Sequence, residues 1–286
     1  MLMSDLKEIA KDIRNVLENR RKELDITFVE EDHIYHMRDE DGNMRSNYPS
    51  VSKVLKKFYK EFPAEEIANK KANGDPEVKT KLLQEWSKAG TYSTNMGSRV
   101  HYFLEKKTCE IFDLGKEVRQ PIFECDFTQT LKSDSMISAG EKYLSLMKER
   151  NLEILDTEIV LGHPGLGYTG QPDKVWLVKN HNDEVGFVIT DWKSNKPKNF
   201  EENQFTERMF EPYQKLPNNS LGHYFVQLPL YGKLLLKMLE GTKYENLRLF
   251  GCIIVLLKES GEYEEFRVPK EVIDTTLRMS IEMYVK

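Results

Sequence analysis

The order of the secondary-structure elements after residue 97 constrains the fold more than any other feature of the sequence. Helical periodicity gives way to three strand-like runs, and a polar loop, a helix and two further strands follow. The predicted strands cover residues 152–161, 174–179, 185–190, 250–257 and 263–268, and the predicted helices cover residues 97–113, 135–150, 221–239 and the segment from residue 270 onward. Such an order packs most naturally as a mixed sheet with helices on both faces. The fold class is therefore predicted to be α/β.

The first ninety residues are predicted to be additions to this core. The apolar residues of segment 5–24 are spaced as in an amphipathic helix. Residues 26–37 suggest a hairpin that closes at an acidic turn. Ser50 is placed to cap the N-terminus of the helix that follows it.

The element order divides the chain into a core and an N-terminal extension. We predict that residues 1–90 form a helical and hairpin extension packed on a core of residues 91–286. The helix that begins near residue 76 is expected to be interrupted at residues 90–95. The polar stretch near residues 199–219 is predicted to be an insertion in that core.

Charge and cysteine content exclude several classes of protein. The 286 residues include 42 Lys or Arg and 47 Asp or Glu, a formal net charge of −5, which disfavours binding of nucleic acid through a uniformly basic surface. No apolar run suits a signal peptide or a membrane span, and residues 1–25 are too acidic for a mitochondrial presequence. Cys109, Cys125 and Cys252 are too scattered for a disulfide framework or a zinc ribbon. We expect a cytoplasmic protein without membrane association.

One segment is basic despite the acidic total. Residues 45–71 contain seven bases and three acids, a local net charge of +4. Four of these bases are spaced to share one helical face: Lys53, Lys56, Lys57 and Lys60. A lysine stripe is more often a solvated face than a binding surface, but it gains interest beside a site that handles phosphate.

Two acids mark the ends of two predicted strands. Asp173 opens one strand, and Asp191 ends the next after an apolar run. If the two strands form an antiparallel hairpin, the two carboxylates lie side by side at its open end. Two carboxylates side by side repel each other unless a cation lies between them, and carboxylate oxygens suit Mg²⁺ or Mn²⁺.

Lys193 lies two residues beyond Asp191 and therefore faces the same side of an extended strand. A lysine in that place can hold an attacking water or stabilise charge on a phosphate. The spacing acid-x-Lys is weak evidence by itself, because it occurs four times in the chain. Only Asp191-Trp192-Lys193 ends an apolar strand paired with a second acid-bearing strand.

Pro172-Asp173 and Asp191-Trp192-Lys193, separated by a hairpin, resemble the signature of the PD-(D/E)xK nuclease superfamily. Gly97 to His101 matches G-x-x-x-H on an upstream helix, and Gln227 to Tyr231 matches Q-x-x-x-Y on a downstream helix, as in the RecB-type branch. Tyr48 to Ser52 is similar to a segment of mitochondrial genome maintenance exonuclease and related phage exonucleases. The resemblance implies a restriction-endonuclease-like core.

The same resemblance implies roles for individual residues. His101, Asp173 and Asp191 would ligate the metal with the backbone carbonyl of Trp192, and Lys193 would be catalytic. Glu158, on the preceding strand, is a further candidate acid. Gln227 and Tyr231 would shape the site and contact the nucleic-acid strand, and their i, i+4 spacing places them on one helical face, as it does His101 and Glu105.

Each of these residues also fits a structural role when it is considered alone. His101 fits a packed, hydrogen-bonded residue, and Asp173 fits a cap of the glycine-rich turn. Lys193 fits a solvated strand end, Tyr231 a core residue and Gln227 a polar helix face. Their joint occurrence in the order of the family favours the functional interpretation.

The expected function is divalent-metal-dependent hydrolysis of DNA by an exonuclease that prefers single-stranded ends, with one or two Mg²⁺ or Mn²⁺ ions. Strand affinity would come from Arg99, Lys196, Lys198 and the lysine stripe. An endonuclease on the same core and a non-cleaving nucleic-acid-binding module are the alternatives, and replication or recombination proteins are possible partners. The cysteines fall short of the four that usually hold an iron–sulfur cluster, so none is expected.

Overall fold

A five-stranded mixed sheet lies at the centre of the computed structural model, which describes residues 6–29, 34–204 and 206–285. The strand order is β10-β9-β8-β7-β4. The strands are β4 (Glu153–Thr157), β7 (Lys174–Lys179), β8 (Val185–Lys193), β9 (Arg248–Leu257) and β10 (Tyr263–Arg267). β8 and β9 are parallel, and the other neighbours are antiparallel. The predicted α/β class with a mixed central sheet is confirmed.

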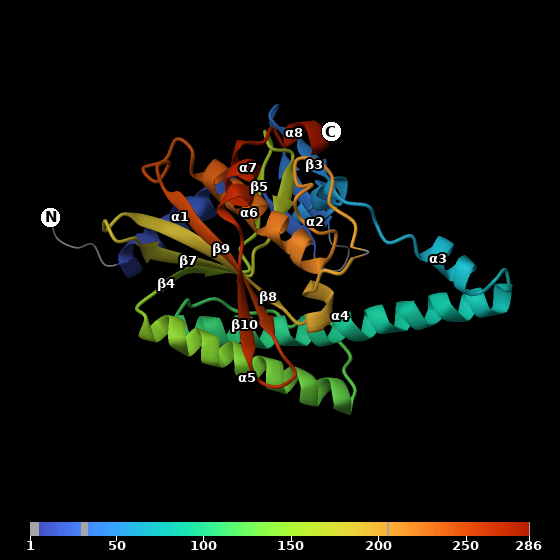
Figure 1. Cartoon of the computed structure of the whole chain (residues 1–286). Helices are drawn as coiled ribbons and strands as arrows, with labels where there is room; N and C mark the ends of the chain where they lie inside the picture. Colours follow the sequence, from blue (N-terminus) through green and yellow to red (C-terminus); the bar gives the residue numbers. More distant parts are fainter. Residues whose placement is uncertain (1–5, 30–33, 205, 286) are drawn as a thin grey trace.

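Helices cover both faces of this sheet (Figure 1). On one face lie α4 (Pro76–Phe112) and α5 (Phe127–Glu149), and on the other lie α1 (Leu6–Glu23), α6 (Ser220–Leu239) and α7 (Lys270–Arg278). β8 shows why both faces are covered, because its side chains alternate between two cores. Phe187 and Ile189 pack in the core with α6, whereas Val188 and Trp192 pack with α4 and α5.

The predicted N-terminal helical and hairpin additions are also confirmed, but the acidic turn at residues 39–43 joins the second and third of the short strands and does not close the hairpin of residues 26–37. After α1, three short strands form an antiparallel sheet, and three short helical segments follow it. These elements are β1 (Thr27–Val29), β2 (Ile34–Arg38), β3 (Met44–Ser46), α2 (Val51–Leu55), the 3₁₀ turn η1 (Lys56–Phe58) and α3 (Ala64–Lys71). Ser50 caps α2 as predicted, accepting a bond from the Lys53 amide. Arg14 of α1 donates to the carbonyls of Ile154 and Leu155, which holds α1 along the edge strand β4.

Three helix and strand boundaries differ from the prediction. α4 runs unbroken for 37 residues, so the expected break at residues 90–95 is wrong, and residue 90 lies inside the helix. The hydroxyls of Thr91 and Ser93 bond carbonyls one turn back in the same helix and do not cap a new one. α5 begins at Phe127 and not near residue 135, because Asp126 and Gln129 form a capping box. The predicted strand 152–161 divides into β4 and β5 (Leu161–His163), which pairs with β6 (Tyr168–Gly170).

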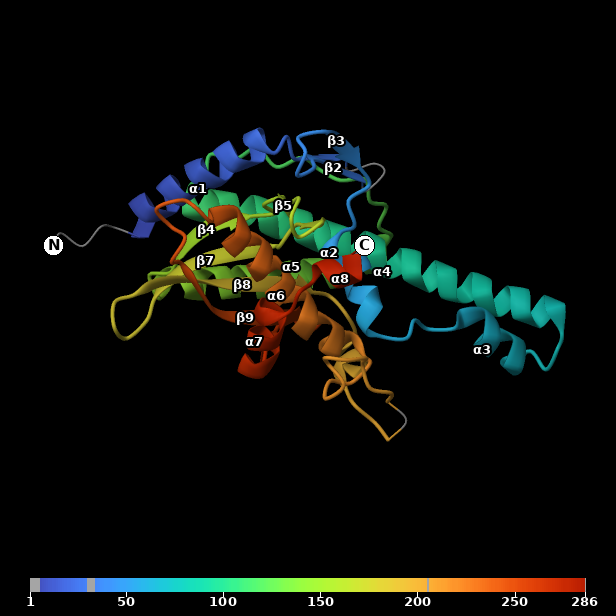
Figure 2. The same cartoon turned by 90° about the horizontal axis from the view of Figure 1, so that it is seen from above.

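The N-terminal half of α4 projects beyond the body of the molecule, with α3 lying alongside it (Figure 2). The C-terminal half packs on α5 and the sheet. A 3₁₀ turn, η2 (Pro197–Phe200), starts the polar stretch before α6, and α8 (Glu282–Val285) ends the described chain. In the parts of the chain that the structure describes, no helix has both the length and the apolarity needed to cross a membrane.

α6 is tied to the segment after η1 by a ring pair. The His223 ring stacks on Tyr59 with 3.7 Å between centroids, and its Nε2 lies 2.7 Å from Asn218 Oδ1. Burial lowers the pKa of His223 to about 4. Since the unfolded chain takes up this proton near pH 6.5, the folded state should lose stability as the pH falls from about 6.5 through 4.

Between pH 7 and pH 4.5 the wild type should lose on the order of 1–2 kcal/mol in its free energy of unfolding through His223, a value discounted because the ring is partly exposed. We expect His223→Gln not to show this loss. The measurement is the free energy of unfolding in urea at pH 7 and pH 4.5 for the wild type, His223→Gln and the exposed-site control His181→Gln. An equal pH-dependent loss in wild type and His223→Gln would contradict the expectation.

Candidate metal centre

Four elements bring the predicted site residues to one end of the sheet. α4 supplies His101, the residue after β4 is Glu158, Asp173 precedes β7, and β8 ends with Asp191 and Lys193. The register pairs Lys174 with Thr190, so the next pair outward is Asp173 and Asp191. The predicted hairpin and its acidic open end are therefore confirmed as geometry.

Three side chains converge closely enough to share one ion. His101 Nδ1 lies 3.3 Å from Asp173 Oδ1 and 3.8 Å from Glu158 Oε1. One ligand atom from each of the three residues lies within 4.8 Å of the others. Neighbouring ligands of an octahedral ion with bonds near 2.1 Å are about 3 Å apart, so small side-chain movements suffice to bind it.

The backbone of Trp192 completes one side of this arrangement. Its N–H donates to Asp173 Oδ2 over 2.6 Å, which leaves Oδ1 facing His101. In an antiparallel strand the N–H and C=O of one residue point to the same edge. The Trp192 carbonyl is therefore expected to face β7 as well, and its role as a metal ligand stays a prediction.

Asp191 and Lys193 lie next to the three-residue group and bind each other. They form an ion pair in which Asp191 is buried and Lys193 partly buried, and Lys193 Nζ also lies 4.3 Å from the centre of the Tyr224 ring. Asp191 is not one of the three converging residues, whereas Glu158, a secondary candidate in the sequence, is.

Glu158 owes its place to a distorted turn after β4. Its φ of 49° is left-handed, which is unfavourable for a residue with a side chain. Its N–H donates to the Asp173 carbonyl over 3.0 Å, and the Thr157 hydroxyl donates to the same carbonyl over 2.8 Å. The two carboxylates are thus fixed relative to each other through their own backbones.

Burial and mutual repulsion perturb the titration of the group. Burial and the charge of Asp173 raise the pKa of Glu158 to about 7. Burial acts to lower the pKa of His101, but the Asp173 and Glu158 carboxylates outweigh it and raise the pKa to about 10. Burial acts to raise the pKa of Asp173, but the positive charges of His101 and Lys193 hold it well below its usual range. Both carboxylates thus face the same imidazole nitrogen, Nδ1, and compete for the proton on it. A metal ion can replace that proton.

Charged side chains of both signs surround the group. The carboxylates are Glu105, Asp156, Glu158, Asp173 and Asp191, and the cations are Lys116, Lys174 and Lys193, with Arg14 and Arg21 acting on Asp156. The donor set of two carboxylates, one imidazole and a carbonyl suits Mg²⁺ or Mn²⁺.

Gln227 and Tyr231 form a wall of the site. The Gln227 side-chain amide donates to Tyr231 Oη over 3.0 Å, and both residues are buried. Gln227 Oε1 has no hydrogen-bond partner among the described residues. The Tyr231 ring needs the glycine at position 170, because a Cβ there would lie 2.6 Å from Tyr231 Cε1. Both residues can shape the site, and their contact with nucleic acid stays a prediction.

The predicted cationic residues are dispersed and partly neutralised. Lys60 lies beyond η1, so the prediction that it shares a helical face with Lys53, Lys56 and Lys57 is wrong, because the helix ends at Phe58. Lys56 pairs with Glu61 at 2.5 Å and Lys60 with Glu207 at 3.1 Å. The five remaining cations are four exposed lysines and Arg99, which contacts α5.

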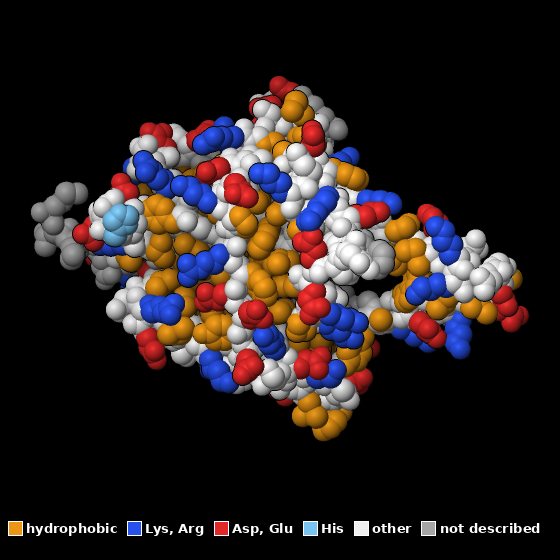
Figure 3. Space-filling view, viewed as in Figure 1, with side chains coloured by type: hydrophobic (Ala, Val, Ile, Leu, Met, Phe, Trp, Pro, Cys, Tyr) orange, Lys and Arg blue, Asp and Glu red, His pale blue; other side chains and the backbone are white. Residues whose placement is uncertain are grey.

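Lys53, Lys57, Lys196 and Lys198 are exposed. Arg99 donates to Ser133 Oγ at 2.6 Å and pairs with Asp134 at 2.7 Å, and so holds α4 to α5. Figure 3 shows basic and acidic side chains interspersed over the face in view. The DNA-binding roles of these residues remain predictions.

Lys116 and Lys174 are charged neighbours of the group that the sequence analysis missed. Lys174 is 1% exposed, and its ammonium lies 4.6 Å from the centre of the Trp192 ring. A charged residue at the start of an otherwise apolar strand was the available signal for Lys174. Lys116 lies in a polar connection and gave none.

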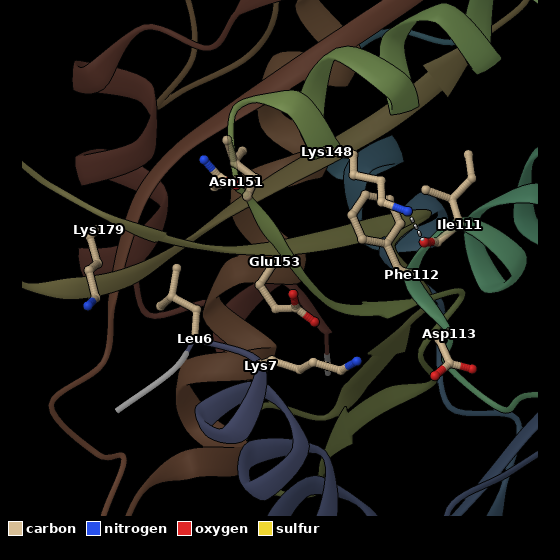
Figure 4. Close-up of a pocket in the computed structure, with 10 residues that line it drawn as sticks. Leu6, Lys7, Ile111, Phe112, Asp113, Lys148, Asn151, Glu153 and Lys179 are labelled. Carbon is tan, nitrogen blue, oxygen red and sulfur yellow. Dashed lines mark hydrogen bonds between the residues drawn. The ribbon is translucent and has the colours of Figure 1, made fainter. Parts of the chain in front are cut away.

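A cavity of about 700 Å³ lies elsewhere, between the ends of α1, α4 and α5 and the sheet (Figure 4). It is lined by Leu6, Lys7, Ile111, Phe112, Asp113, Lys148, Asn151, Leu152, Glu153 and Lys179. None of the predicted site residues lines it, so it contributes nothing to the metal centre.

Comparison of the sequence with protein-family models returned no match, and comparison with curated proteins returned none either. Function therefore has to be argued from the site.

Proposed function

We propose that the chain is a divalent-metal-dependent deoxyribonuclease related to the RecB-type PD-(D/E)xK nucleases. The observation that carries the proposal is the convergence of His101, Glu158 and Asp173 beside the Asp191–Lys193 pair. Three ligands next to a carboxylate and an ammonium are the parts that metal-assisted phosphodiester hydrolysis needs. The mixed sheet with its acidic hairpin end is compatible with the restriction-endonuclease-like core that the motifs imply.

The bound ion would activate a water and polarise the phosphate. The chain itself contributes the alignment of its groups. Trp192 holds Asp173 so that one oxygen faces the imidazole, and the Lys193 ammonium is held by Asp191 and the Tyr224 ring on the same side of the sheet. Lys193 would orient the attacking water or stabilise the charge that develops on the phosphate.

The proposed substrate is DNA with single-stranded ends, and the proposed activity is exonucleolytic, in the cytoplasm of a bacterial or phage-infected cell. Tyr224, partly exposed beside Lys193, offers an aromatic face on which an unpaired base can stack. Trp192 and Tyr231 are buried and offer no such face.

Removal of the metal tests the proposal. We expect hydrolysis of end-labelled linear single-stranded DNA in Mg²⁺ or Mn²⁺ and none in excess EDTA, with activity restored by added Mn²⁺. Equal hydrolysis in EDTA would contradict the metal mechanism. Comparison with closed circular single strands distinguishes ends from internal sites, since an endonuclease cuts both at similar rates.

Metal binding should also stabilise the fold. At a Mn²⁺ concentration of 100 times the dissociation constant, linkage adds about 2.7 kcal/mol to the free energy of unfolding. Glu158→Gln should lose most of this gain because it removes a converging ligand. Thermal unfolding with and without Mn²⁺ measures it, and the surface variant Glu207→Gln serves as the control. An undiminished gain in Glu158→Gln would exclude Glu158 as a ligand.

A further inference from the structure

Lys116 lies in the connection between α4 and α5 and contacts three acceptors. Its Nζ lies 2.5 Å from the Thr157 carbonyl oxygen, 3.3 Å from Glu105 and 3.9 Å from Asp156. The first two contacts are within hydrogen-bond distance, whereas Asp156 acts on the ammonium only through its charge. Lys116 itself does not touch His101, Glu158 or Asp173 in any contact recorded for the described residues.

The carbonyl that Lys116 binds belongs to the peptide unit that joins Thr157 to Glu158. The N–H of the same unit donates to the Asp173 carbonyl over 3.0 Å. The planar unit is therefore held at both ends. The next rotatable bond is the one that gives Glu158 its left-handed φ of 49°, and that conformation persists in a residue with a side chain only where its surroundings enforce it.

We propose that Lys116 is a positioning residue, which directs the Glu158 carboxylate toward the metal by clamping this peptide unit. The inference rests on the proposed metal centre. It explains why a lysine that touches no ligand is placed among two acids at the edge of the site.

A purely electrostatic role predicts the opposite effect on metal binding. Removing one positive charge beside Glu105 and Asp156 makes the surroundings more negative, which strengthens binding of a cation. Removing a clamp lets Glu158 relax to ordinary backbone conformations, and this weakens metal binding. The sign of the change therefore separates the two roles.

The experiment is titration of Mn²⁺ into the full chain by calorimetry. Lys116→Met should raise the Mn²⁺ dissociation constant about tenfold or more, the usual effect of losing a group that orients a ligand. Lys116→Arg, which keeps the charge and the donors, should restore binding. Lys148→Met is the matched control, because Lys148 also donates to a backbone carbonyl of α4, that of Ile111 at 3.0 Å, away from the site (Figure 4).

A double variant tests the route through Glu158. In the Glu158→Gln background, Lys116→Met should change the Mn²⁺ dissociation constant less than twofold, because the group that it positions is already removed. If Lys116→Met does not fold, Lys116→Gln, which removes the charge but keeps a donor, is expected to act in the same direction. Circular dichroism verifies folding.

Unchanged or tighter Mn²⁺ binding in Lys116→Met would overturn the inference, as would an equal loss in Lys148→Met. DNA hydrolysis by the wild type is measured separately. If the wild type binds Mn²⁺ but hydrolyses no DNA, the proposed function fails and the Lys116 comparison still decides the inference. If it binds no Mn²⁺, both fail.

Discussion

Lys193→Met should lower the rate of DNA hydrolysis by about 10²–10⁴-fold, the range for loss of a group that moves a proton or stabilises transition-state charge. Lys193 is the ammonium held beside the metal centre by Asp191 and the Tyr224 ring. Methionine keeps much of the length and apolar volume of the side chain but has no charge or N–H donor. Mn²⁺ binding by His101, Glu158 and Asp173 should persist, because Lys193 supplies no ligand.

The measurement is single-turnover hydrolysis of end-labelled DNA, with Mn²⁺ affinity determined on the same preparations. Lys215→Met is the matched control, since Lys215 is exposed and has no proposed role in the site or in DNA binding, and it should change the rate less than a few-fold. A Lys193→Met protein that retains a tenth of the wild-type rate would remove Lys193 from the mechanism. Loss of Mn²⁺ binding in that variant would mean that its effect is on the ion and not on the reaction.

Gly222→Ala should destabilise the fold by about 3 kcal/mol, at the upper end for overpacking, because the obstacle is backbone. Gly222 lies buried in the first turn of α6, and a Cβ there would lie 2.0 Å from the Pro217 carbonyl oxygen. The Asn219 side chain accepts a bond from the Gly222 amide, so the turn cannot shift without losing its cap.

Urea unfolding of the two proteins measures this effect. The control is Gly251→Ala in β9, where no atom lies within 4 Å of the added Cβ, and its stability should stay within about 0.5 kcal/mol of the wild type. A Gly222→Ala protein as stable as Gly251→Ala would mean that the loop carrying Pro217 yields freely.

The central sheet could be predicted because its signals are local. Apolar alternation and turn residues place β7 and β8 and the hairpin between them, and the hairpin register then sets Asp173 opposite Asp191 without further information. The two-sided helical cover follows from strands that are apolar on both faces.

The errors arose where tertiary contacts or helix continuity override local signals. The polar residues near Gly90 resemble a helix end in the sequence. In the structure the hydroxyls of Thr91 and Ser93 donate to carbonyls of the preceding turn, and the helix continues. Glu158 joins the metal centre through backbone bonds to Asp173, fifteen residues further along the chain. Lys116 reaches it only because Asp113 and Gly115 adopt positive φ and turn the chain back along α4. No periodicity encodes such contacts.

The parallel pairing of β8 with β9 has a consequence for a chain during its synthesis. Asp191 and Lys193 lie on β8, and their neighbours on β9 are Ile254 and Leu256. A ribosome that has completed β8 must add α6 and then β9 before this edge of β8 is paired. A product truncated before residue 248 would expose β8 as an unpaired edge, prone to join other chains. If the chain is the proposed nuclease, its site cannot be completed before β9 has been translated.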